Sequence, residues 1–174
     1  MERRKFIQNT VVVSGGLLVA PQLLAQSWSE RDPKNKLTIL HTNDTHSNID
    51  PFPENHAKYP GKGGVARRYE MIQKIRSEEE NVLLLDAGDI FQGTPYFNKY
   101  SGVLEMKLMS KLGYDAGTMG NHDFDGGMEG FVKAQEFADF PFVCSNYNFS
   151  NTPIEGRTEE FTIIKKGNVK IGIF

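Results

Sequence analysis

The sequence predicts an α/β fold in which parallel strands alternate with helices, and three features of the chain predict it. Short apolar runs recur at residues 37–40, 82–85 and 116–119. Segments with apolar residues at helical spacing lie between these runs. Each run is followed by a polar segment rich in turn-forming residues. This alternation is typical of βαβ units, whose ligands gather beyond the carboxyl ends of the strands.

The first βαβ unit is expected between residues 37 and 85. Residues 37–40 form a candidate buried strand, which a long loop rich in Asn, Pro and Gly follows over residues 43–63. A helix is expected over residues 64–77, because side chains recur there at helical spacing, namely Val65, Tyr69, Ile72 and Arg76. Residues 82–85 are entirely apolar and predict a second strand.

The second unit contains another helix and a third strand. A helix is expected over residues 103–112, where one face carries Leu104, Leu108 and Leu112. Gly113 is a natural stop for this helix, since glycine adopts the left-handed conformation that ends many helices. Residues 116–119 then predict a third strand, which leads into the glycine-rich loop 120–127.

The C-terminal third is expected to add a helix, a strand and a hairpin. Phe131, Ala134 and Ala138 mark the helix, and residues 141–145 predict the strand. Residues 161–164 and 169–174 flank a Lys-Lys-Gly-Asn turn, which indicates an antiparallel hairpin.

The N-terminal residues 1–27 resemble an export signal of the twin-arginine type. Arg3 and Arg4 precede a short apolar run over residues 11–20, which is shorter than the ~20 apolar residues that cross a bilayer. An ordinary secretory signal is the alternative. Residues 28–36 are expected to be a linker. We therefore expect export to the periplasm or outside the cell by the twin-arginine machinery, without a stable membrane anchor.

Composition excludes several classes of partner and site. The 174 residues carry a net charge of −2, which argues against binding to a nucleic-acid polymer. They are 39% hydrophobic and 24% charged, as expected for a globular domain. The single cysteine, Cys144, excludes an internal disulfide and a zinc site made of several thiolates, and it is expected to be buried.

Three polar clusters follow the three predicted strands, at residues 43–46, 86–89 and 120–125. They contain carboxylates, imidazoles and an amide, which are ligands that suit hard or borderline divalent metals. Because the carboxyl ends of parallel strands meet at one edge of a sheet, the clusters are expected to lie together. The sequence therefore predicts a metal-assisted hydrolase site at this edge.

Four residues are the candidate ligands. Asp44 and His46 are two residues apart, so in extended backbone both side chains face the same way and can chelate one ion. Asp89 can sit between two ions, and Asn121 offers a neutral oxygen to the second. Two divalent ions ~3.5–4 Å apart can hold a bridging hydroxide and neutralise a phosphoryl group under attack.

His122 and Asp125 are the candidate catalytic pair. His122 directly follows Asn121 and is expected to point differently from it, which favours a catalytic role over ligation. Asp125 is placed to accept a hydrogen bond from the imidazole and so to support its protonated form. His122 could then stabilise charge on the phosphoryl oxygens or protonate the leaving alkoxide.

Other polar residues of these segments are assigned structural roles. Asp86 and Asp123 are expected to be loop or capping carboxylates. His41 and His56 have no partner cluster and are expected to be structural or solvated. A metal-free hydrolase that uses a carboxylate pair such as Asp86 with Asp123 is an alternative, but it leaves His46 without a role.

Three motifs together resemble the bacterial 5′-nucleotidase family of the calcineurin-like metallophosphoesterase superfamily. They are residues 41–46, residues 88–89 with 93–95, and residues 120–125. The resemblance implies a four-layer αββα sandwich and two divalent ions, with Zn, Mn, Co and Mg as candidates. It also implies six site residues: Asp44 and His46 on one metal, Asp89 as the bridge, Asn121 on the second metal, and His122 with Asp125 as a catalytic dyad.

The resemblance covers residues 37–174 and corresponds to the N-terminal part of the family's catalytic domain. The family has a later Gly-His-x-His motif, whereas this chain has no histidine after His122. A truncated domain is therefore expected, and a separate protein carrying the C-terminal 5′-nucleotidase domain is a candidate partner. Where most members have Glu in the third motif, this chain has Asp123.

The function expected from these features is hydrolysis of a nucleotide or another phosphate ester by an exported metal-dependent phosphomonoesterase. A hydroxide activated by two metals would attack phosphorus. One alternative is a metallophosphodiesterase acting on cyclic nucleotides or nucleotide sugars. Another is a non-catalytic remnant that binds metal or nucleotide.

Overall fold

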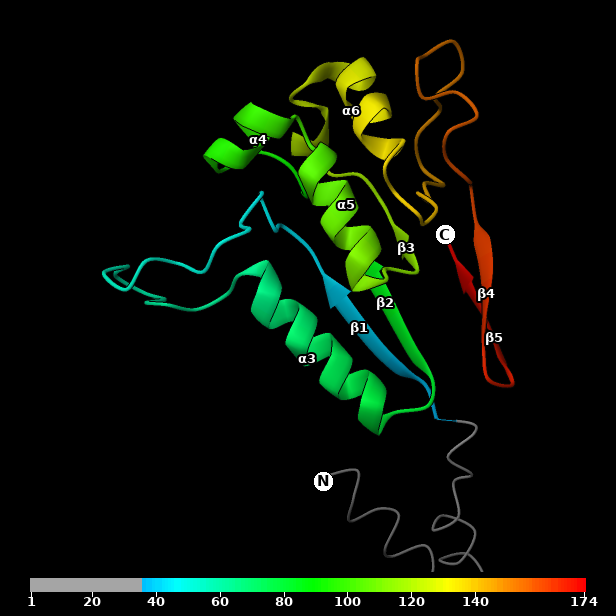
Figure 1. Ribbon diagram of the computed structural model, residues 1–174. Coiled ribbons are helices and arrows are strands. Elements are labelled where there is room, and N and C mark those ends of the chain that lie inside the picture. The colour runs from blue at the N-terminus through cyan, green and yellow to red at the C-terminus, as the bar shows by residue number, and fades with distance from the viewer. Residues whose placement is uncertain (1–35) are drawn as a thin grey trace, which may run out of the picture. The chain divides into compact units, whose positions relative to one another are not determined.

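The structure of the chain is a computed structural model, and it describes residues 36–174 (Figure 1). The expected export signal, residues 1–27, and nearly all of the expected linker lie outside the described residues. Both therefore stay predictions. Among the residues that are described, no helix is long and apolar enough to cross a membrane.

A three-stranded parallel sheet confirms the predicted fold class. Its strands are β1 (Thr38–Thr42), β2 (Val82–Asp86) and β3 (Ala116–Gly117), in the order β1-β2-β3. Thr42 pairs with Asp86, and Asp86 pairs with Gly117, so the three strands end level with one another. The polar segments that follow the strands therefore start from the same edge of the sheet.

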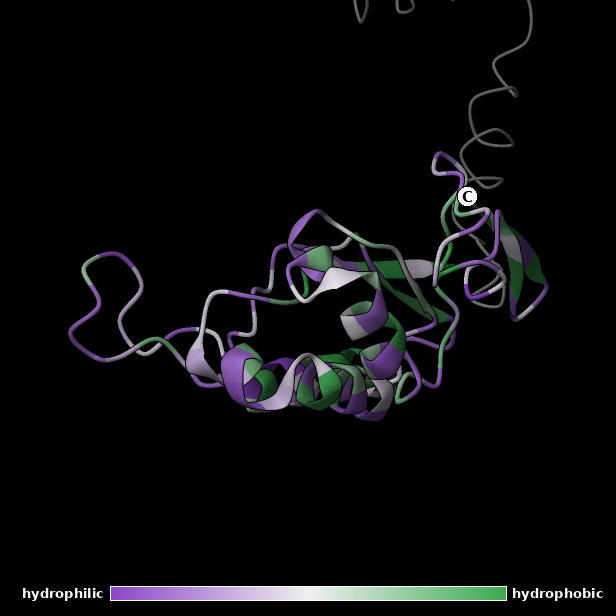
Figure 2. Cartoon of the chain, turned by 90° about the horizontal axis from the view of Figure 1, so that it is seen from above, coloured by the Kyte–Doolittle hydropathy of each residue, from purple (hydrophilic) through white to green (hydrophobic). Residues whose placement is uncertain are grey.

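Helices cover one face of this sheet. They are α3 (Val65–Glu78), α5 (Val103–Leu112) and α6 (Gly127–Gln135). In the view from above, the helices gather on one side of the strands (Figure 2). The apolar core lies between the two layers, where Leu84 of β2 packs with residues of all three helices, including Ile72, Met106, Leu112 and Phe131. Burying these side chains is the main stabilising contribution to this layer pair.

One predicted strand is shorter than expected, and another does not form. β3 ends at Gly117 instead of residue 119, because Gly117 already pairs with Asp86, the last residue of β2. Residues 141–145 form no regular strand. They make single bridges instead, Gly117 with Phe142 and Val143 with Glu159.

Two short helices were not predicted. Helix α4 spans Pro95–Tyr100, and a 3₁₀ turn, η2, spans His122–Phe124. The Thr94 hydroxyl accepts a hydrogen bond from the Tyr96 N–H at 3.3 Å, and Pro95 occupies the first helical position. Thr followed by Pro is a recognised helix start, so the sequence contained the signal for α4.

The predicted hairpin is confirmed. Strands β4 (Thr162–Lys166) and β5 (Val169–Ile173) pair antiparallel and form a separate two-stranded sheet. The Lys166 ammonium lies 2.7 Å from the Asp115 carboxylate, just before β3. Of the four layers expected, the described residues thus show the helices and the parallel sheet, with this hairpin as a second, smaller sheet.

Asp86 is buried at the end of β2, with 5% of its surface exposed. Its carboxylate accepts hydrogen bonds from the Thr42 hydroxyl at 2.5 Å and the Gly88 N–H at 2.9 Å. Burial raises the pKa of Asp86 to about 6. Asp86 was expected in a loop or cap, but it is the last residue of β2, and these contacts give its carboxylate a structural role at the strand end.

The ionisation of the buried Asp86 carboxyl should make the free energy of unfolding depend on pH. In metal-free protein the folded state keeps the Asp86 proton up to about pH 6, whereas an ordinary aspartate releases it near 3.8. Stability therefore falls as the pH rises through this window. Asp86→Asn should not show this loss. The free energy of unfolding of the variant minus that of the wild type should therefore increase by ~2–3 kcal/mol as the pH rises from about 3.5 to 7.5. Urea unfolding in EDTA at several pH values measures the difference, and parallel pH profiles would contradict it.

Candidate metal centre

The segments that follow β1 and β2 run side by side beyond the end of the sheet. The Asp44 N–H donates to the Gly88 carbonyl at 2.9 Å, and the His46 N–H donates to the Asp89 carbonyl at 3.1 Å. The Ser47 N–H continues the series with a 2.8 Å hydrogen bond to the Ile90 carbonyl. These bonds extend the pairing of the two strands and place Asp44 and His46 opposite Asp89.

The backbone at these three residues is strained. Asp44, His46 and Asp89 have φ angles of 51°, 44° and 56°, which is the left-handed region that residues other than glycine rarely adopt. The expectation of an extended backbone between Asp44 and His46 is therefore wrong, although the two side chains do approach each other. Strain of this kind persists only where the surroundings hold it and is concentrated at functional sites.

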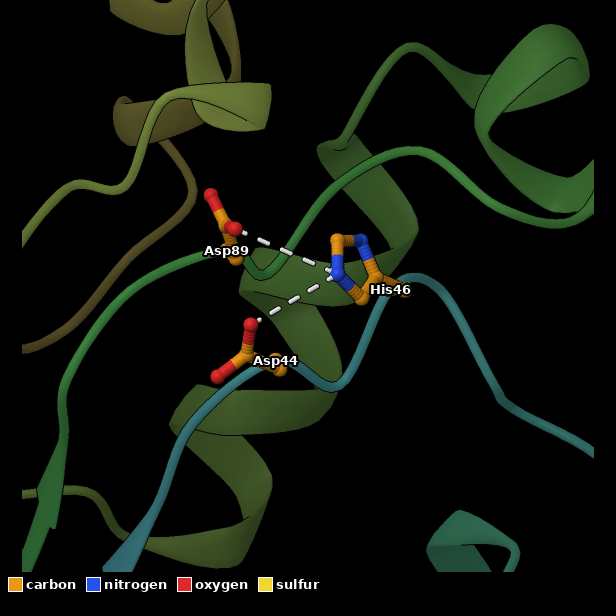
Figure 3. Close-up of side chains that lie close together, drawn as sticks. All are labelled: Asp44, His46 and Asp89. Atoms are coloured by element: carbon orange, nitrogen blue, oxygen red, sulfur yellow. Dashed lines mark ion pairs between the residues drawn. The ribbon is translucent and has the colours of Figure 1, made fainter.

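The three side chains converge on one point (Figure 3). His46 Nε2 lies 3.8 Å from Asp44 Oδ1 and 3.9 Å from Asp89 Oδ2. One ligand atom from each residue lies within 4.8 Å of the other two. His46 Nδ1 lies 3.2 Å from the Phe91 carbonyl, a partner that can only accept. Nδ1 then carries the hydrogen, and the Nε2 lone pair faces the two carboxylates.

This donor set fits a divalent ion. Two carboxylate oxygens and one neutral imidazole nitrogen are a mixture that zinc, manganese and cobalt accept. A cation between Asp44 and Asp89 would also relieve the repulsion between their two negative charges. The candidate site is thus suited chemically to the first of the two ions expected.

The third polar segment, residues 120–125, lies against Gly88 and Asp89 because the two backbones approach closely. Gly88 has a φ angle of 94°, and a Cβ atom on it would collide with the Gly120 nitrogen. A Cβ on Gly120 would overlap the Asp89 carboxylate. The His122 N–H donates to Asp89 Oδ1 at 3.0 Å. Asn121, between Gly120 and His122, is therefore held beside Asp89, and its role as a ligand to a second metal stays a prediction.

The buried carboxylate of Asp123 holds together the two segments that carry Asp89 and Gly120. Asp123 is 1% exposed, and its carboxylate accepts hydrogen bonds of 2.8–3.0 Å from four backbone N–H groups, those of Asp89, Ile90, Phe91 and Gly120. Burial raises the pKa of Asp123, and the four donors act against that rise. Asp123 was expected to be a loop or capping carboxylate, and it holds loop backbone without capping a helix. The carboxylate pair named for the metal-free alternative, Asp86 with Asp123, is buried on both sides, and both members accept backbone N–H groups, which disfavours that alternative.

His122 and Asp125 form the contact that their spacing predicted. His122 Nδ1 lies 2.9 Å from Asp125 Oδ2. This hydrogen bond raises the pKa of His122. The His122 ring stands edge-on to the His46 ring, with 5.2 Å between the ring centroids. The pair therefore lies beside the candidate metal site, and its catalytic role stays a prediction.

Two other histidines lie apart from this cluster. His41 is exposed on β1. The His56 ring accepts the Tyr59 N–H at 2.9 Å and packs against Phe52, with 4.6 Å between the ring centroids. Neither residue belongs to the group around His46. The structural or solvated roles expected for them agree with these positions, and Cys144 is buried as expected.

Sequence reasoning did not foresee two contributors to the site. The Phe91 carbonyl orients His46, and a carbonyl leaves no signal in a residue pattern. The pattern predicts a loop or capping carboxylate at Asp123, but it does not show that this carboxylate binds the Asp89 N–H. The glycines that precede Asp89 and Asn121 were a signal that backbone segments approach closely here.

Comparison with known proteins places the chain in a family. The profile of the calcineurin-like phosphoesterases matches residues 37–172, which are most of this chain. The chain belongs to this family. Among the relatives of this calcineurin-like phosphoesterase, snake venom 5′-nucleotidase from Gloydius brevicauda is 40% identical over 145 residues, and 5′-nucleotidase from Homo sapiens is 40% identical over 146. Each alignment covers 79% of this chain and 25% of the relative.

Solved structures agree with this assignment. The 5′-nucleotidase precursor from Thermus thermophilus matches with a TM-score of 0.73 at 36% identity, over 79% of this chain and 28% of that one. The NAD nucleotidase from Haemophilus influenzae matches with a TM-score of 0.70 at 30% identity, over 79% and 26%. The calcineurin-like phosphoesterase described here thus spans about a quarter of the length of these relatives. The resemblance predicted from the three motifs is confirmed, and so is the fold class.

Proposed function

We propose that this chain supplies the metal-binding part of a metal-dependent phosphomonoesterase that hydrolyses nucleotides. The observation that carries the proposal is the convergence of Asp44, His46 and Asp89, with ligand atoms within 4.8 Å of one another, at the end of a parallel sheet. The relatives named 5′-nucleotidases, at about 40% identity, support the substrate class. The family assignment supports a hydrolytic role.

Four of the six site residues would bind metal, and the other two would act on the substrate. Asp44 and His46 would hold one ion, Asp89 would bridge, and Asn121 would bind the second. When bound, a pair of divalent ions polarises a phosphoryl group and makes a water acidic enough to act as a nucleophile.

His122 would act on the phosphoryl group from beside this pair. Its bond to Asp125 favours the protonated imidazole, which can donate to a phosphoryl oxygen as negative charge develops there. The same proton can pass from the imidazole to the departing alkoxide. Asp125 keeps the ring oriented through this step, because its carboxylate fixes the hydrogen on Nδ1 and leaves Nε2 free to face the substrate.

The test is AMP hydrolysis by the purified protein that carries this sequence, stripped with EDTA and reloaded with Mn²⁺. We expect His122→Ala to lower kcat by ~10²–10⁴-fold, which is the usual contribution of a general acid or base. Mn²⁺ affinity should stay at the wild-type value, because His122 is not a proposed ligand. His56→Ala is the matched control and should keep full activity. Hydrolysis that survives EDTA would contradict the metal-dependent mechanism, and bound Mn²⁺ without turnover would favour the non-catalytic alternative.

A second substrate class has one observation in its favour. The structural neighbour from Haemophilus influenzae is an NAD nucleotidase, at 30% identity. A substrate with a phosphoanhydride bond, such as a dinucleotide or a nucleotide sugar, is therefore the second candidate. Comparing AMP with NAD as substrates of the same preparation separates the two classes.

We also propose that the protein is exported through the twin-arginine route to the periplasm or the cell exterior. Relatives include snake venom enzymes and a bacterial precursor protein. Arg3 and Arg4 lie at the start of the expected signal. Changing both to Lys keeps their charge but should block export, leaving the protein in the cytoplasmic fraction on immunoblots. Unchanged export of the double variant would exclude this route.

A further inference from the structure

A small, partly open cavity lies behind the segment that carries His46. It has a volume of about 20 Å³ and lies between α3, α5 and the segment after β1. The remaining lining is apolar, and the polar residues in its wall are Thr45, Ser47, Asn48, Arg68 and Glu105. The cavity is separate from the candidate metal site, because none of the three converging ligands lines it.

Two polar side chains in this wall are buried without a protein partner. Glu105 is 3% exposed, and neither of its carboxylate oxygens has a hydrogen-bond partner among the described residues. Ser47 is 1% exposed, and its hydroxyl also has none within that part of the chain. Buried polar groups are almost always hydrogen-bonded, because an unmet donor or acceptor loses its hydration without compensation. A buried carboxylate and a buried hydroxyl that both lack a hydrogen-bond partner in the described protein, at one cavity, indicate a ligand between them.

The size and charge of the cavity define this ligand. A single water molecule needs roughly 10–15 Å³ of such space and two to four polar partners. The cavity offers about 20 Å³, an acceptor in Glu105 and a hydroxyl in Ser47. The Arg68 side chain in the same wall brings a positive charge that disfavours a cation.

The water would connect α5 to the most constrained part of the metal-binding segment. Ser47 directly follows His46, and both have left-handed backbone, with φ angles of 52° and 44°. The Ser47 N–H bonds to the Ile90 carbonyl at 2.8 Å, and its own carbonyl accepts the Thr94 hydroxyl at 2.7 Å. The hydroxyl is the remaining polar group of Ser47.

We propose that this cavity is a built water site in which one water accepts the Ser47 hydroxyl hydrogen and donates to the Glu105 carboxylate. Through this bridge Glu105 is a positioning residue for His46, because it holds the neighbouring residue in its strained conformation. The positioning role rests on the proposed function of His46 as a metal ligand, whereas the water site itself does not.

Three variants test the bridge. Glu105→Met matches the length of the side chain but removes its hydrogen-bonding atoms, and Ser47→Ala removes the other partner. Glu105→Gln is the conservative control, since its amide can still bond to water. We expect the first two variants to weaken Mn²⁺ binding by ~10–100-fold, as loss of a group that orients a ligand does, and Glu105→Gln to bind Mn²⁺ like the wild type. Isothermal titration of the metal-free protein measures this.

Two further measurements keep the outcomes distinct. Circular dichroism and urea unfolding report whether each variant folds, and Ser47→Ala decides the result if Glu105→Met does not fold. Nuclear Overhauser contacts between bound water and the Ser47 amide should appear in the wild type and vanish in both disruptive variants. Wild-type Mn²⁺ affinity in Glu105→Met and Ser47→Ala would overturn the positioning role. Failure of the wild type to bind Mn²⁺ would instead refute the proposed function, and the absence of water contacts in the wild type would overturn the water site.

Discussion

Replacing Asp89 with alanine should remove high-affinity Mn²⁺ binding from this protein, with a loss of more than ~100-fold, beyond what the loss of an orienting group costs. Asp89 is the central residue of the candidate centre. One of its oxygens lies 3.9 Å from His46 Nε2, and the other accepts the His122 N–H at 3.0 Å. Its removal leaves Asp44 and His46 as two ligands of different kinds on one segment, which is too few to hold a divalent ion tightly.

Calorimetry and thermal unfolding measure this loss independently. Because Mn²⁺ binds only the folded state, it should raise the melting temperature of the wild type and leave that of Asp89→Ala unchanged. Asp139→Ala removes a carboxylate outside the site and serves as the matched control. Equal Mn²⁺ affinity of the two alanine variants would show that the converging side chains do not hold the metal.

Asp123→Asn should be the most destabilising of the conservative substitutions, lowering the free energy of unfolding by ~2–4 kcal/mol. The Asp123 carboxylate accepts four backbone hydrogen bonds, two on each oxygen. An amide group would turn an N–H toward two of these donors and leave them buried without an acceptor. Since one of the four donors is the Asp89 N–H, Mn²⁺ affinity should fall along with stability.

Two variants separate this effect from a general response to mutation. Asp125→Asn makes the same chemical change two residues away at a partly exposed position, and it should cost little stability. Asp123→Glu keeps the carboxylate and introduces the residue that the family resemblance implies for this position, so it should be tolerated far better than Asp123→Asn. Urea unfolding of the three variants orders them. Equal stability of Asp123→Asn and Asp125→Asn would contradict the anchoring role.

The elements with strong local patterns were the ones that the sequence predicted well. Helix α5 has the expected bounds, and β2 extends the expected run of apolar residues by one. In both, apolar residues close together in the chain carry the signal. The buried face of α5 differs from the predicted leucine face, since the helix buries Glu105, Met106, Met109 and Leu112. The length of β3 was not predictable in this way, because it depends on where the adjacent strand β2 ends.

The candidate site shows the same division between local and long-range information. Residue types and their order along the chain were enough to identify Asp44, His46, Asp89 and Asn121 as ligand candidates and to join His122 to Asp125. They also indicated that all six residues follow strands that end at one edge of a sheet. Periodicity, turn chemistry and ligand type are properties of short segments, so they can be recognised before the chain is folded.

Contacts between distant segments could be seen only after folding. The left-handed backbone at Asp44 and His46, the orientation of His46 by the Phe91 carbonyl, and the four N–H groups held by Asp123 all depend on residues that are far apart in the chain. In the sequence Glu105 is an ordinary member of an amphipathic helix. It lines the cavity beside Ser47 only when α5 packs against the segment that carries Asp44 and His46. Such roles arise from burial and from hydrogen bonds across the fold, which no short stretch of residues contains.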